Sequence, residues 1–106
     1  MNSRQKGARG ERELAKVFRG HGFDSRRSQQ YCGIAGDSDV IGIPGWHVEC
    51  KRVERLNVEN ALKQAIRDSK GESIPVVCHR KDRGEWIASM RLEDWLRLIK
   101  GGRSDG

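Results

Sequence analysis

The chain has 106 residues, enough for one small domain, and 35% of them are hydrophobic while 34% are charged. Lys and Arg outnumber Asp and Glu by 21 to 15, and the net charge of +6 favours an anionic partner, nucleic acid before membrane. The charge alone also fits a basic domain that binds no nucleic acid. Neither an apolar leader region nor a run of membrane-spanning length is present, so we expect a soluble, cytoplasmic protein.

The periodicity of the apolar residues predicts the elements in chain order. It predicts a helix at 6–22, strands at 25–28, 39–43 and 46–53, a helix at 58–69, strands at 73–80 and 85–90, and a final helix from Leu92 to Ile99. The order α-β-β-β-α-β-β-α predicts an α/β domain, a central mixed β-sheet flanked by helices. We expect residues 1–100 to form this single domain and residues 101–106 to be a disordered tail.

The cysteines form no Cys-x-x-Cys pair, and their odd number indicates free thiols in a reducing compartment. A zinc site built from Cys50, Cys78, His47 and His79 is opposed by strand alternation. His47 and Cys50 would face opposite sides of their strand, as would the adjacent Cys78 and His79.

The predicted hairpin over residues 39–53 carries charged side chains within apolar runs. Glu49 and Lys51 point to one side of their strand, and the turn at Pro44-Gly45 brings Asp39 onto the neighbouring strand. These charges could simply face water, as on an amphipathic strand. Convergent carboxylates, however, bind hard divalent cations, and a nearby lysine stabilises developing phosphate charge or positions an attacking water.

The first predicted helix carries a third carboxylate. Glu11 shares the face of Leu14 and Phe18, which we expect to be buried. It could act only as a glutamate near the positive end of the helix dipole. A helix packed beside the hairpin would instead add Glu11 to the group formed by Asp39 and Glu49.

The segment "SDVIGIPGWHVECK" resembles the PD-(D/E)XK nuclease motif, an acidic residue, a turn and Glu-x-Lys, with Ser38 in place of the usual proline. "KGARGERELAKVFRGHGF" resembles the opening of archaeal-type Holliday junction resolvases, a group with similarly short phage-encoded members. The resemblance implies a restriction-endonuclease-like core. In it, Asp39 and Glu49 would bind metal with the Cys50 carbonyl, Lys51 would be catalytic, and Glu11 would act directly or through water.

The resemblance also implies an endonuclease that uses Mg²⁺, or Mn²⁺ in its place, and no small-molecule cofactor. It would nick four-way junctions symmetrically as a homodimer, in DNA recombination and repair, and the resemblance to the short members of the group extends to an origin in a phage. Gln64 could support the site or be an ordinary solvated helix residue. Tyr31, in the loop 29–38, could stack on an unpaired base or simply be exposed. The expected DNA-binding residues are Lys6, Arg9, Arg12, Arg26, Arg27, Ser28 and Arg52.

Other functions fit parts of the same pattern. A nicking, flap or restriction-like nuclease would share the chemistry but cut duplex or other branched DNA. A catalytically silent DNA-binding protein would keep the basic surface alone. Clustered carboxylates argue against it, because they repel phosphates unless a cation intervenes.

Overall fold

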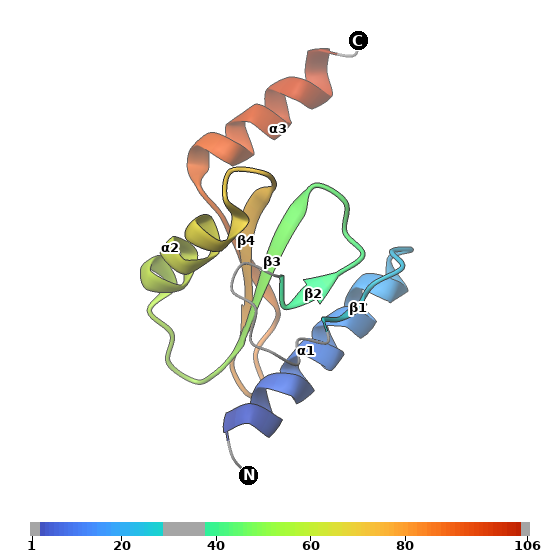
Figure 1. Ribbon diagram of the computed structural model, residues 1–106, viewed down its shortest axis with the longest axis vertical. Helices are drawn as coiled ribbons and strands as arrows, with labels where there is room; N and C mark the ends of the chain where they lie inside the picture. Colours follow the sequence, from blue (N-terminus) through green and yellow to red (C-terminus); the bar gives the residue numbers. More distant parts are fainter. Residues whose placement is uncertain (1–2, 29–37, 105–106) are drawn as a thin grey trace.

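The computed structural model describes the backbone of residues 3–28 and 38–104 and the side chains of residues 7–28 and 38–101. Within these residues it has one five-stranded sheet and three helices (Figure 1). The elements are α1 (Ser3–Gly20), β1 (Arg26–Arg27), β2 (Val40–Ile41), β3 (Trp46–Arg52), α2 (Val58–Ser69), β4 (Ile74–Arg80), β5 (Ile87–Ser89) and α3 (Leu92–Ser104). This order confirms the predicted succession of helices and strands.

The sheet has the strand order β1-β2-β3-β4-β5 and is mixed. β3 and β4 run parallel at its centre, and the other neighbouring strands are antiparallel. The parallel pair requires a crossover connection, which α2 supplies. β2 and β3 therefore form a hairpin at one side of the central pair.

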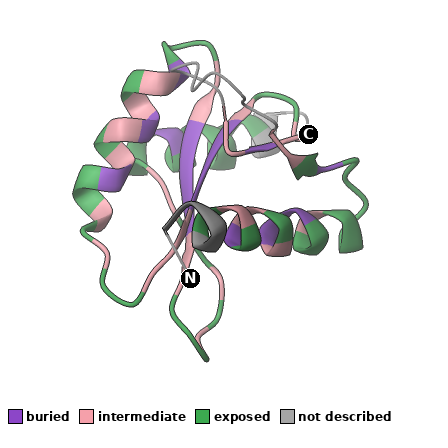
Figure 2. Cartoon of the chain, turned by 60° about the horizontal axis from the view of Figure 1, so that its bottom comes forward, coloured by how far each residue is buried: buried purple, intermediate pink, exposed green. Residues whose placement is uncertain are grey.

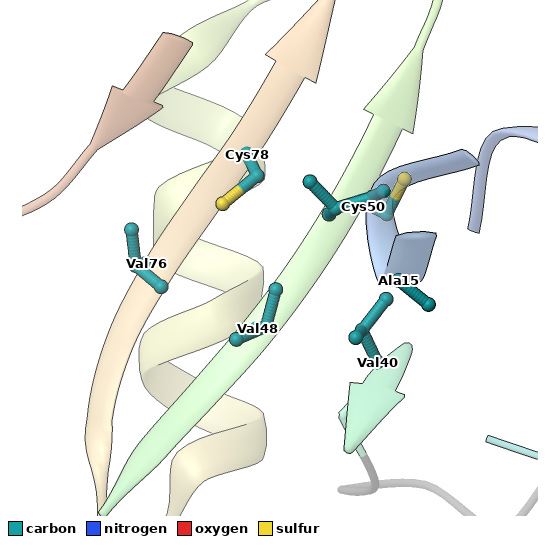
Figure 3. Close-up of a cluster of buried hydrophobic side chains, with 7 residues drawn as sticks. Ala15, Val40, Val48, Cys50, Val76 and Cys78 are labelled. Atoms are coloured by element: carbon teal, nitrogen blue, oxygen red, sulfur yellow. The ribbon is translucent and has the colours of Figure 1, made fainter. Parts of the chain in front are cut away.

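The side chains of β3 and β4 alternate between two cores, one on each face of the sheet. Val48, Cys50 and their register partners on β4 pack with residues of α1 (Figure 3). On the other face, Val77 packs with Ala61 and Ala65 of α2. Figure 2 shows the buried residues along the central strands and along the helices. A residue of β3 that shares the face of Val77 therefore points toward α2.

Helix α1 approaches β3 closely at Gly10. A Cβ atom at this position would lie 2.6 Å from Cβ of Arg52 and 3.8 Å from Sγ of Cys50. Real Cβ atoms are not found this close to another carbon, so the absence of a side chain lets the helix rest against the strand. The contact places Glu11, the next residue along the helix, near the β2–β3 hairpin.

The prediction of a strand at 39–43 is wrong in length, because β2 covers Val40–Ile41 alone. Gly42 follows with φ of 94°, a left-handed conformation that breaks an extended strand. A Cβ atom at Gly42 would lie 2.1 Å from the carbonyl oxygen of Asp24, so the backbone needs glycine there. The hairpin pairing is thus confined to the residues next to Asp39.

Helix α2 has the predicted bounds, and its ends explain why. Asn57 caps the first turn by accepting a hydrogen bond from the backbone N–H of Asn60, 3.0 Å away. Lys70 follows the last turn in the left-handed conformation, with φ of 54°. Both ends are therefore set by local sequence.

Helix α3 differs from the prediction at its end. It continues to Ser104, so residues 101–104 are helical and the expected disordered tail is not found there; residues 105–106 lie outside the described part. A glycine costs a helix only about 1 kcal/mol relative to alanine, which weakens a helix without ending it. The helix projects from one end of the molecule (Figure 1). Among the residues described, no helix is both long and apolar enough to cross a membrane.

Candidate active site

The hairpin brings Asp39 and Glu49 together. Val40 pairs with Val48, so the same register continued by one residue sets Asp39 opposite Glu49. The backbone N–H of Asp39 donates to the carbonyl of Val48 at 2.8 Å. Its carboxylate Oδ2 accepts from the backbone N–H of Cys50 at 2.8 Å, which fixes the side chain against β3. Glu49 is buried, with 3% of its surface exposed.

Burial and negative charge raise the pKa of both glutamates. The pKa of Glu49 rises from 4.5 to about 8, first through burial, then through the charge of Asp39 and a side-chain hydrogen bond with Asp39. The pKa of Glu11 is also raised, by burial and then by the charge of Asp39, although Arg27 opposes the shift. Carboxylates this close disfavour each other's charged form, and a divalent cation between them would relieve that repulsion.

Glu11 and Arg27 form the third side of the site. The two side chains make an ion pair with 2.8 Å between Nε and Oε1. A hollow of about 190 Å³ is lined by these residues together with Ser28 and Asp39. The hollow is thus lined by two carboxylates and one guanidinium.

Lys51 lies on the same face of β3 as Glu49, as strand alternation predicts. Its Nζ is 3.5 Å from Oε1 of Gln64 on α2, at the outer limit of a hydrogen bond. Gln64 is half-buried rather than fully solvated. The structure therefore places Gln64 beside Lys51, the position that a supporting residue needs.

Only the backbone of Cys50 faces the hairpin site. Its thiol belongs to the core under α1, with the thiol of Cys78. Burial raises the pKa of both thiols, that of Cys78 to about 11, so they stay protonated at neutral pH. The face opposite carries His47 and Glu49. The arrangement agrees with the argument against a zinc site, and Cys32 lies outside the described residues.

Basic side chains gather next to the acidic hollow. Arg12, Arg26 and Arg27 line a larger hollow of about 470 Å³ with Ile41. Arg27 lines both hollows, so the basic surface adjoins the carboxylates. Arg9 is exposed on α1. The side chain of Lys6 and the loop residues 29–37, which include Tyr31, lie outside the description.

Arg52 is placed differently from the expectation of a DNA-binding residue. Its guanidinium makes ion pairs with Glu13 at 3.4 Å and with Asp82 at 2.7 Å. Glu13 also binds Arg80 of β4. These contacts tie α1 to β3 and β4, and they engage the guanidinium with carboxylates of the protein itself.

No protein-family model matches the chain, and no curated protein matches its sequence. Among solved structures, the chain is similar to Hjc of Archaeoglobus fulgidus, a Holliday junction resolvase from an archaeal hyperthermophile. The TM-score is 0.61 over 80% of this chain and 72% of that chain, at 21% sequence identity. The chain has the fold of this resolvase. The restriction-endonuclease-like architecture that the resemblance implied is thereby confirmed.

Two residues of the site were not singled out for it from the sequence. His47 Nε2 lies 2.8 Å from Oε1 of Glu49, and both side chains are buried. Asp68 of α2 completes the group, since the potential metal-binding atoms of the three residues all lie within 4.8 Å of one another. Alternation along β3 places His47 on the face of Glu49 and Lys51, and Asp68 follows Gln64 by one helical turn. These two spacings are the signals that could have found them.

Proposed function

We propose that this protein is a metal-dependent, structure-selective DNA endonuclease that resolves Holliday junctions by symmetric nicks. The observation that carries the proposal is the approach of Asp39 to Glu49 on the hairpin, with Lys51 on the same strand face. The fold shared with a resolvase supports it. Such an enzyme would act in recombination and repair in the cytoplasm; an origin in a phage rests on the sequence resemblance alone.

The metal would be held by oxygen ligands. Asp39 and Glu49 would bind it directly, together with the Cys50 carbonyl, and Glu11 would bind it directly or through water. The residues fit a hard cation because two carboxyl groups are forced together in a buried place where their own charges repel. When bound there, Mg²⁺, or Mn²⁺ in its place, would supply polarisation of the phosphate and a lower pKa of the attacking water.

The side chains of the chain itself orient the reaction. Lys51 would place its ammonium where negative charge develops on the phosphate, and Gln64 would restrict that ammonium to one side of the strand. Lys51 is half-buried, so its charge is less screened there than in bulk water. Water would attack in line with the leaving oxygen, and Lys51 would hold the phosphate in the orientation that this attack requires.

DNA would reach the site over the basic hollow. Arg12, Arg26 and Arg27 surround a space next to the carboxylates, and Ser28 lines the smaller hollow. Contacts of this kind go to phosphates and fix the position of the DNA without reading bases. Lys6 and Arg9 would extend the surface along α1. Arg52 would instead hold the structure together through Glu13 and Asp82.

Symmetric cutting of a junction would involve a second copy of the chain. A four-way junction is resolved by cutting two strands, whereas the described residues hold one Asp39–Glu49 site. Helix α3 would supply the apolar surface for such a homodimer. Leu92 and Trp95 are more than half exposed, and Leu96 and Ile99 continue the same helical face.

The test is cleavage of a labelled four-way junction beside a linear duplex of the same arms, with Mg²⁺ and with chelator. We expect Mg²⁺-dependent cutting of the junction alone. Glu49→Gln should lower the rate of junction cleavage by at least about 100-fold. Losing a residue that only hydrogen-bonds to a metal ligand has a smaller effect. Glu72→Gln, at an exposed carboxylate outside the site, is the matched control.

Other outcomes would contradict parts of the proposal. Equal cutting of duplex and junction would remove the junction preference and favour a nuclease of broader substrate range. If the protein bound DNA but did not cut it at any metal concentration, the proposal of an enzyme would be wrong.

A further inference from the structure

His47 is a buried polar side chain that the proposed chemistry does not use. It is 3% exposed and lies on β3, two residues before Glu49 and on the same face. Its Nε2 atom is 2.8 Å from Oε1 of Glu49. A histidine in such a position is either a filler of the core or a group that orients its neighbour.

Helix α2 builds the surroundings of this pair. Ala61 and Ala65 are buried, and their small side chains let the helix lie close to the strand face that carries His47. From this face α2 offers Gln64 to Lys51 and, one turn later, Asp68 to the pair of His47 and Glu49. Helix α2 thus lies against Lys51 at one point of β3 and against His47 and Glu49 at another.

A carboxylate has two oxygens, and in Glu49 one of them is engaged by His47. Glu49 also hydrogen-bonds with Asp39, and the second oxygen would be the one available to Asp39 and to a cation between the two strands. Without a partner on Oε1, a buried carboxylate can rotate toward either side, and its second oxygen no longer has a fixed direction. Partners that hydrogen-bond a ligand fix its orientation, and their loss typically lowers metal affinity or activity by about 10- to 100-fold.

We propose that His47, supported by Asp68, is a positioning residue that holds Oε1 of Glu49 so that the remaining oxygen faces Asp39. The inference rests on the proposed function, because it concerns the same metal site. It assigns α2 a role in that site: the helix fixes Lys51 through Gln64 and fixes Glu49 through Asp68 and His47.

The experiment compares the wild type with His47→Gln and His47→Leu. The glutamine amide nitrogen can occupy the place of Nε2, whereas leucine fills the volume without a polar group. Mg²⁺ and Mn²⁺ affinity is measured by calorimetry, independently of activity, and the Mg²⁺ concentration for half-maximal junction cleavage is measured beside it. His79→Leu is the matched control, because His79 is a histidine of β4 whose Nε2 lies 2.9 Å from Oγ of Ser89 and whose register partner is Lys51, not Glu49.

We expect His47→Leu to weaken metal binding by about 10- to 100-fold in both measurements and His47→Gln to stay near the wild type. The Michaelis constant for the junction and the affinity of the His79→Leu control for metal should not change. Should His47→Leu fail to fold, His47→Asn replaces it. Its shorter amide cannot reach the place of Nε2, and it is expected to weaken metal binding relative to His47→Gln.

Wild-type metal affinity in His47→Leu, or equal affinity in the Asn and Gln variants, would overturn the inference and leave a structural histidine. A cation bound by His47 itself would also overturn the inference. In that case calorimetry would count one bound metal ion fewer per chain in His47→Gln than in the wild type, while the Mg²⁺ concentration for half-maximal cleavage stayed the same. A wild-type protein that neither binds metal nor cuts DNA would instead refute the proposed function. The two failures are therefore distinguishable.

Discussion

At the scale of single residues, the site depends on Glu49, a carboxyl group in surroundings that disfavour its charge. It is buried, it hydrogen-bonds with Asp39, and its pKa rises to about 8. Lys51 lowers the pKa, but burial and Asp39 outweigh it. In the metal-free protein, ionising Glu49 is therefore unfavourable in free energy, and a bound cation would offset this.

The raised pKa of Glu49 predicts that the free energy of unfolding depends on pH when a chelator keeps the protein free of metal. The folded state holds the Glu49 proton more tightly than the unfolded state, whose pKa is near 4.5. The stabilising contribution is therefore complete below pH 4.5 and is lost as the pH rises through about 8. Urea unfolding of the wild type and of Glu49→Gln over this interval checks it. The difference in unfolding free energy between the two proteins should change with pH, and a constant difference would contradict the account.

At the scale of elements, the site depends on how closely α1 lies against β3. Gly10 permits the approach, and Glu11 follows it directly. The ion pairs of Glu13 with Arg52 and Arg80 hold the same helix to the two central strands. A change in the depth of α1 would move Glu11 relative to Asp39.

Two glycines of α1 allow a matched test of this contact. Gly10→Ala should lower the unfolding free energy by about 1–3 kcal/mol, since the new methyl group meets Cβ of Arg52. Gly7→Ala should raise it by about 1 kcal/mol, because nothing lies within 4 Å and alanine favours the helix. Both are measured by urea unfolding. Stabilisation by both substitutions would show that α1 does not rest on β3 at Gly10.

The elements and the site were predictable from the sequence to different depths. Local sequence is enough to predict α2, whose apolar stripe begins after the capping residue Asn57. It is also enough to predict the hairpin that pairs Asp39 with Glu49. The early end of β2 follows from a contact between Gly42 and Asp24, which are distant in sequence. Asp68 was missed for the same reason, because it meets His47 and Glu49 only once α2 lies on the sheet. The position of His47 on the face of Glu49, in contrast, follows from strand alternation.

At the scale of the whole molecule, α3 is the least integrated element. It projects from the body (Figure 1) and exposes Leu92, Trp95 and Leu96. Its polar contacts include the ion pairs of Asp94 with Arg97 of the same helix and with Arg91, the residue that precedes the helix. A second copy of the chain would cover this apolar face and supply the second site that a junction requires.

The homodimer proposal predicts the effect of charge on that face. Trp95→Glu should raise the dissociation constant of the dimer by at least about 30-fold, as expected for an anchor worth about 2 kcal/mol. Val17→Glu, at an exposed apolar residue of α1, should leave it unchanged. Light scattering and sedimentation over a concentration series measure both. A wild type that stays monomeric, or a variant that dimerises as tightly, would contradict the proposal.

In the proposed function, the hairpin carboxylates hold a cation and the protein cuts a four-way junction at paired positions. The most direct measurement labels each strand of the junction in turn and maps the nicks made in Mg²⁺ by the wild type and by Glu49→Gln. The account predicts nicks at matching positions in two opposing strands, an uncut linear duplex, and no nicks from the variant. Unpaired nicks, or cutting that persists in Glu49→Gln, would contradict it.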